Sequence, residues 1–225
     1  MCGRYAITSP LEAILKAFNV KSARSNLRPR YNAAPSQDLP VVRAGPDGRE
    51  LGLIRWGLVP SWSKGPDSRY SMINARAETV AGKPAYRGPF RRRRCLVPAN
   101  GFYEWKKVSD GKQPYFITLS AGGVFAFAGL WDHWTGPEGE EITSFTIVVT
   151  AANDCVRPIH DRMPVILEPE DYDSWLGERG VPSRTKLAIM LRPYPAELMQ
   201  AFPVGRDVNS PTNDSPVLQN RVEYQ

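Results

Sequence analysis

The chain has 225 residues and a mass of 25.1 kDa, carries a formal net charge of +6, and is 42% hydrophobic with six Trp, which favours one folded domain with a substantial core. No run of 18 apolar residues occurs and no charged segment followed by an apolar one opens the chain, so we expect a cytoplasmic protein without a membrane span or signal peptide. Three Cys without a CxxC pair, and only two His, argue against a disulfide framework and a structural zinc site.

The predicted elements begin with one short helix and continue as a series of strands. Ser9 is the expected N-cap and Pro10 the first residue of an amphipathic helix that reaches about Phe18. Segments rich in Val, Ile, Phe, Trp and Tyr are expected to be strands, at residues 40–44, 52–59, 95–108, 114–119, 124–134, 142–150 and 164–167. Turn sequences at 45–48 and 109–112 separate neighbouring strands.

Towards the C-terminus, two further helices are expected at residues 170–176 and, after Pro195, at 196–202. The tail after about Val208 is rich in Asn, Ser, Pro and Thr and is expected to be irregular. This order of elements predicts an α+β fold, built on a curled, mainly antiparallel β-sheet or barrel with a few peripheral helices. We expect one domain over residues 1–225.

The positive charge is concentrated in one part of the chain. From residue 55 to residue 94, ten Lys and Arg stand against two acidic residues, a net charge of +8, whereas the other 185 residues sum to about −2. Aromatic residues are interleaved with these cations at Trp56, Trp62, Tyr70 and Tyr86. The pattern is typical of a groove that binds a phosphate backbone and stacks bases. An ordinary solvated basic face is the alternative.

Cys2 directly follows Met1. We expect Met1 to be removed, which leaves Cys2 with a free α-amine and a thiol. An α-amine has a pKa of about 7.7–8.0, so part of it is an uncharged nucleophile at neutral pH. Such an amine condenses with an aldehyde to a Schiff base, and the thiol then closes on the same carbon to give a thiazolidine, because the attack is intramolecular. The alternative is a chance cysteine at a frayed terminus.

Three internal segments carry groups suited to proton transfer or phosphate binding. Asn74 and Arg76 stand two positions apart in an extended segment, so their side chains are expected to face the same way. Asn74 would offer an amide as hydrogen-bond donor and acceptor, and the Arg76 guanidinium would bind a phosphate. Glu104 has aromatic neighbours, and poor solvation is expected to raise its pKa. His160 stands next to an acid and an arginine and is a candidate acid or base. For each, a structural or surface role is the alternative, and His133 is expected to pack in the core.

Six segments together resemble the SOS-response-associated peptidase (SRAP) family, in family order and over most of the chain: MCGRY (1–5), YNAAP (31–35), RWGLVPSW (55–62), INARAET (73–79), CLVPANGFYEW (95–105) and HDRMPVIL (160–167). The resemblance implies a single SRAP-type domain that binds single-stranded DNA carrying an abasic site. In that family the mature N-terminal cysteine attacks the ring-opened sugar aldehyde and forms a thiazolidine crosslink, which shields the lesion during the DNA damage response.

The resemblance also implies residue roles. Cys2 would be the nucleophile through its amine and its thiol, and Asn74 would orient the N-terminus and the sugar. Glu104 would assist proton transfer, and His160 would assist sugar ring opening and crosslink reversal. Contacts to phosphates or bases are implied for Arg4, Arg76, Arg162 and Trp105.

No cofactor is expected, and the implied partner is single-stranded DNA with abasic sites, bound by a monomer in the cytoplasm and associated with the nucleoid when on DNA. Two other classes of protein remain open. One is an N-terminal cysteine hydrolase, a peptidase that uses His160 and Glu104 as base and orienting group and removes its own Met1. The other is a passive single-strand binder in which Cys2 is incidental. The basic stretch favours DNA over a peptide substrate.

Overall fold

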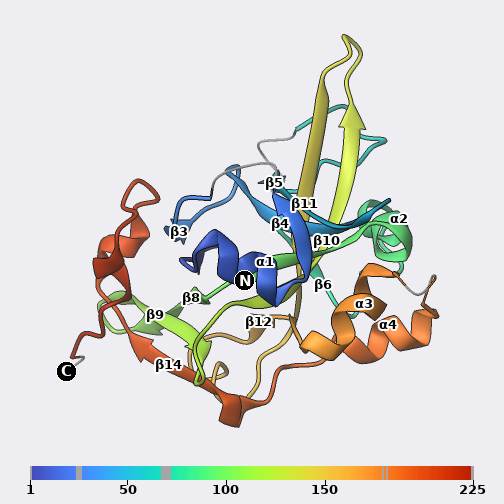
Figure 1. The fold of residues 1–225 in the computed structure, drawn as a ribbon. Coiled ribbons are helices and arrows are strands. Elements are labelled where there is room, and N and C mark those ends of the chain that lie inside the picture. The colour runs from blue at the N-terminus through green and yellow to red at the C-terminus, as the bar shows by residue number, and fades with distance from the viewer. Residues whose placement is uncertain (1, 24–26, 67–71, 179, 181, 224–225) are drawn as a thin grey trace.

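Two β-sheets form the centre of the molecule, and short helices lie around them (Figure 1). The computed structural model describes residues 2–23, 27–66, 72–178, 180 and 182–223. Met1, Arg69 and Tyr70, which enter the predictions above, lie outside the described residues.

The five-stranded sheet positions the N-terminal segment. Its order is β14-β9-β8-β1-β3, and all neighbouring pairs are antiparallel. The strands are β1 (Tyr5–Ile7), β3 (Arg30–Ala33), β8 (Gly101–Val108), β9 (Gly111–Leu119) and β14 (Met199–Pro203). Tyr5 pairs with Phe102 and Ala6 with Gly101, so the chain start runs along β8.

The second sheet is larger and has the order β12-β11-β10-β7-β4-β5-β2, with β13 beside β10 and β6 beside β11. Most of its pairs are antiparallel, whereas β2 with β5, and β5 and β6 with β11, are parallel. Its strands are β2 (Val20–Ala23), β4 (Asp38–Gly45), β5 (Gly48–Trp56), β6 (Asn74–Arg76), β7 (Arg94–Ala99), β10 (Phe125–Thr135), β11 (Glu141–Ala151), β12 (Arg162–Pro164) and β13 (Ile166–Leu167). The connected ends of β10 and β11 project from the body (Figure 1).

Aromatic side chains from both sheets fill the core. The Tyr5 ring of the smaller sheet meets Trp56 edge-on at 5.2 Å and Phe127 at 5.8 Å between ring centroids, and both partners belong to the larger sheet. Edge-to-face contacts of this kind add to the stability gained by burying the rings. Both predicted turns close hairpins. Gly48 and Gly111 lie in these turns with φ of 122° and 127°, values that glycine adopts more easily than other residues because it has no Cβ.

Within the described residues, four α-helices lie at the periphery: α1 (Leu11–Ala17), α2 (Pro84–Arg92), α3 (Tyr172–Leu176) and α4 (Arg184–Met190) (Figure 1). Short 3₁₀-helices are η1 (Pro169–Asp171), η2 (Ala196–Leu198), η3 (Arg206–Asn209) and η4 (Pro216–Gln219). None of the helices in the described ranges combines the length and apolar character needed to cross a membrane.

The structure confirms the α+β class with mainly antiparallel sheets, and it corrects several local predictions. Ser9 is not the cap of α1, because its backbone N–H and hydroxyl bind the Asn100 side chain at 3.0 and 2.8 Å, and Pro10 is the N-cap residue. The helix expected at 196–202 is wrong, since only η2 forms there and β14 then pairs with the edge of β9. His133 is not in the core; its side chain is 40% exposed on the projecting hairpin.

Candidate active site

The register of the smaller sheet brings the chain start to the middle of β8. The Tyr103 backbone N–H donates to the Arg4 carbonyl at 3.0 Å, so the antiparallel pairing continues beyond β1. The residues before Arg4 stay near this part of β8, because the Glu104 carboxylate is close enough to the Cys2 thiol to raise its pKa. The Cys2 side chain is fully buried.

The surroundings of Cys2 keep its thiol protonated. Burial raises the pKa of the Cys2 thiol, and the nearby Glu104 carboxylate raises it further. The thiol donates a long hydrogen bond of 3.7 Å from Sγ to the Arg4 carbonyl. A thiol in this state is a poor nucleophile until a base removes its proton.

Glu104 and His160 line one cavity of about 400 Å³, together with Trp105, Lys112 and Asn209. The Glu104 side chain is almost completely buried on β8. Burial raises the pKa of its carboxyl, while positive charge nearby, including that of His160, opposes the rise. A buried carboxyl of raised pKa can hold a proton and release it near neutral pH, which is the requirement for general acid or base work.

His160 precedes β12, and its ring orientation is fixed by the backbone. Nδ1 accepts the Arg162 backbone N–H at 3.0 Å, so a neutral ring carries its proton on Nε2. The Asp161 carboxylate oxygen Oδ1 also lies 3.0 Å from Nδ1 and can pair with the ring when it is protonated. The ring is partly exposed at the cavity.

Asn74 and Arg76 occupy alternate positions of β6, which runs parallel to β11. Ala75 between them is buried, so the two side chains lie on the opposite face, as the sequence predicts. The Asn74 amide nitrogen donates to the Ile73 carbonyl at 2.9 Å, and its buried Oδ1 accepts no hydrogen bond within the described ranges. The exposed Arg76 side chain forms no ion pair with a described residue.

The other two arginines of the predicted site have protein partners. Arg162 stands on β12, opposite Ala151 of β11, and pairs with Glu78. Arg4 donates to the Val208 carbonyl at 2.8 Å and to the Asn32 side chain at 3.2 Å, which ties the chain start to the C-terminal tail.

Seven of the eight predicted residues fall into two groups. Glu104, Trp105 and His160 line one cavity and Cys2 lies close to Glu104, whereas Asn74, Arg76 and Arg162 flank β11 and do not line that cavity. Arg4 belongs to neither group and is bound to the C-terminal tail.

Sequence analysis missed two residues that line this cavity. Lys112 reaches it from β9, across the hairpin from Lys107, and Asn209 from η3 accepts the Trp105 indole N–H at 2.7 Å. The hairpin turn at 109–112 was a usable signal for Lys112. No sequence signal linked Asn209 to Trp105, which is more than 100 positions away.

The basic stretch is only partly a surface. Trp56 was predicted as a stacking face and is fully buried, with its indole N–H donating to the Ile73 carbonyl at 3.1 Å. Tyr86 is half-buried and donates to the Asn74 carbonyl at 3.1 Å. Among the described aromatic residues of this stretch, Trp62 alone is largely exposed, at 65%. The described residues contain no cluster of three metal-binding side chains.

Comparison with known proteins decides the family. The family described as SOS response associated peptidase (SRAP) matches residues 1–211. The chain belongs to the SRAP family.

Relatives of this SRAP protein match it over nearly its whole length. The abasic site processing protein YoqW of Bacillus subtilis (strain 168) is 43% identical over 222 residues, which are 97% of this chain and 98% of the relative. The abasic site processing protein HMCES of Gallus gallus is 35% identical over 259 residues, which are 96% of this chain and 76% of the relative. A crystal structure of a protein from Bacteroides thetaiotaomicron superposes with a TM-score of 0.87 at 28% identity and covers 99% of this chain and 100% of that one.

Proposed function

We propose that this SRAP protein senses abasic sites in single-stranded DNA and shields them by a covalent thiazolidine crosslink to Cys2, as part of the DNA damage response. One observation carries the proposal: the buried Cys2 lies within electrostatic reach of Glu104, a buried carboxyl of raised pKa that lines a cavity together with His160. The names of the relatives, abasic site processing proteins, support the same substrate.

The reaction begins when removal of Met1 frees the Cys2 α-amine. The amine attacks C1′ of the open-chain sugar aldehyde to form a carbinolamine, which loses water and becomes a Schiff base. The Cys2 sulfur then adds to the same carbon of the protonated Schiff base, the thiol proton passes to the Glu104 carboxylate, and a five-membered ring closes. The net change joins aldehyde and aminothiol and releases one water, and no oxidant or reductant is needed.

Two groups of this chain move the protons. Protonated Glu104 donates to the departing hydroxyl of the carbinolamine, and the resulting carboxylate accepts the proton of the Cys2 thiol. This second step compensates for the burial that keeps the thiol protonated. The His160 ring is held by its backbone contact at Nδ1. It assists opening of the closed sugar ring before the amine attacks, and it assists closure of the sugar ring when the crosslink is reversed.

The remaining predicted residues bind the strand. Arg76 offers an exposed guanidinium to a phosphate, and Arg162 lies across β11 from it. Asn74 carries a buried amide oxygen that is available to orient the amine or the sugar. Trp105 stands at the cavity edge, where it replaces the missing base in the stack. Arg4 keeps the N-terminal segment in place. The protein acts as a monomer.

A thiolate hydrolase fits the same residues less well. A cysteine hydrolase requires a thiol of lowered pKa, whereas burial and Glu104 raise the pKa of Cys2. The amine is therefore the better first nucleophile, and a peptidase activity is confined in this proposal to removal of Met1.

The experiment uses protein without Met1 and single-stranded DNA with a central abasic site, or with its tetrahydrofuran analogue that lacks an aldehyde. We expect a slower band on a denaturing gel with the first DNA only. A hydrolase would cleave a peptide and give no such band. A passive binder would retard both DNAs on a native gel and neither on the denaturing gel.

A further inference from the structure

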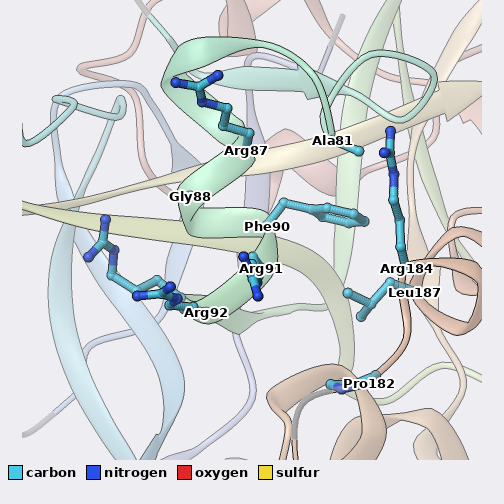
Figure 2. A pocket seen from close by; sticks show the side chains of 10 residues that line it. Ala81, Arg87, Gly88, Phe90, Arg91, Arg92, Pro182, Arg184 and Leu187 are labelled. Carbon is cyan, nitrogen blue, oxygen red and sulfur yellow. The ribbon is translucent and has the colours of Figure 1, made fainter.

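A second cavity, of about 700 Å³, lies between α2 and α4 and shares no residue with the cavity at Glu104 (Figure 2). Its apolar part includes Phe90, which points from α2 towards Arg184 and Leu187 of α4 (Figure 2). We call it the arginine pocket because five arginines line it: Arg87, Arg91, Arg92, Arg93 and Arg184.

Most of these arginines form no ion pair that would stabilise the fold. Arg93 pairs with Asp132 at 2.9 Å. The side chains of the other four are exposed and form no ion pair with any carboxylate of the described residues. The neighbouring Arg94 differs from them, because it is buried and donates to backbone carbonyls, including that of Phe90 at 2.9 Å.

Helix stability does not account for the cluster. Arg87 and Arg91 stand one turn apart on α2, where like charges destabilise a helix. Arg91 and Arg92 in the last turn of α2 suit the negative end of the helix dipole. Arg184 stands in the first turn of α4, where a cation is unfavourable. An anion between the two helices would offset both penalties.

The arginine pocket is continuous with a neighbouring cavity of about 390 Å³. The two share Arg87, Gly88 and Arg93, and the neighbour extends to the exposed Trp62. The chain also links this surface to the strand that holds Asn74 and Arg76, because α2 starts at residue 84, soon after β6 ends at residue 76. Several exposed guanidinium groups around two adjoining cavities suit the repeating phosphates of a DNA strand better than a single small anion.

We propose that the arginine pocket binds backbone phosphates of the DNA at nucleotides away from the lesion. It forms a second contact that raises affinity for longer strands and takes no part in the covalent chemistry. The inference rests on the proposed function for the identity of its ligand.

The test compares two double variants that each remove two positive charges. Arg91→Gln with Arg184→Gln alters the pocket, and Lys186→Gln with Arg192→Gln is the matched control, since both of its residues are exposed on or just after α4 and do not line the cavity. Fluorescence anisotropy measures binding of an unmodified single strand of about 20 nucleotides over a salt series. Loss of two phosphate contacts should weaken binding by about 10-fold and make the log–log salt slope shallower by about 1.4.

A short strand of about six nucleotides with a central abasic site isolates the lesion site. The pocket variant should crosslink it at the wild-type rate, and its melting temperature should equal or exceed that of the wild type because like charges have been removed. If neither protein crosslinks any DNA, the proposed function fails, while the anisotropy arm still tests the pocket.

Three results would overturn the proposal. One is unchanged affinity of the pocket variant for the long strand, and another is an equal loss in the matched control. The third is a loss of binding to polyglutamate with no loss for DNA, which would assign the pocket to an acidic polypeptide.

Discussion

The cavity at Glu104 and the arginine pocket place charge in opposite ways. At the first, Cys2 and Glu104 are buried and their pKa values are raised. At the second, four arginines are exposed without carboxylate partners in the described parts of the chain. Buried groups of shifted pKa suit proton transfer, whereas exposed guanidinium groups suit a polyanion. The two proposals therefore assign the covalent chemistry and the binding of the distant part of the strand to different regions of the molecule.

The largest effect is expected for Cys2→Ala. The variant keeps an N-terminal amine after Met1 is removed but has no sulfur to close the ring, so the stable crosslink should disappear while a Schiff base still forms. Borohydride should trap that Schiff base on a denaturing gel and leave untreated samples without a shifted band. A stable band from Cys2→Ala would show that the thiol is not part of the linkage.

Glu104→Gln separates rate from affinity. Gln retains the shape of the side chain but cannot exchange a proton, so crosslinking at saturating DNA should slow by about 10²-fold or more. Affinity for tetrahydrofuran DNA should stay within about twofold, because no exposed charge is lost. A parallel fall in rate and affinity would contradict the role in proton transfer.

Arg76→Ala should have the complementary profile. Its exposed guanidinium is assigned to one phosphate, so the salt slope should become shallower by about 0.7 and affinity should fall several-fold. The maximal crosslinking rate should change little once DNA is saturating. Arg192→Ala is a control for the loss of one exposed positive charge, and an equal effect there would remove the assignment.

The smallest effect is a pH dependence of stability. The pKa of Glu104 is raised in the folded protein, so the folded state holds its proton at pH values where the unfolded state has lost it, and stability falls as pH rises from the ordinary carboxyl pKa through the folded one. Glu104→Gln lacks this penalty and should melt a few degrees higher, about 2–4 °C, at pH 8 but not at pH 4. The exposed Glu138→Gln should show no such difference, and a gain for Glu104→Gln at pH 4 alone would reverse the sign.

The sequence predicts those parts of the fold that depend on local chemistry. The hairpin turns at Gly48 and Gly111, and the alternation of Asn74 and Arg76 around buried Ala75, follow from backbone preference and strand periodicity. The SRAP assignment, which came from six ordered segments, is also confirmed.

The sequence could not predict the features that depend on contacts between distant parts of the chain. The helix expected at residues 196–202 does not form, because the edge of β9 supplies hydrogen-bond partners to residues 199–203, which become β14. Helix α2 was missed, since Gly88 and Pro89 interrupt it and four arginines follow one another at its end. Asn209 joins the cavity only through the fold, by its bond to Trp105.

Mass spectrometry of the purified crosslink after proteolysis tests whether both the amine and the thiol of Cys2 join the lesion sugar. We expect the N-terminal peptide to begin at Cys2, to carry the sugar remnant with the loss of one water, and to resist both borohydride and thiol alkylation. An N-terminal peptide without the sugar, or a sugar-bearing peptide whose Cys2 thiol still alkylates, would contradict it.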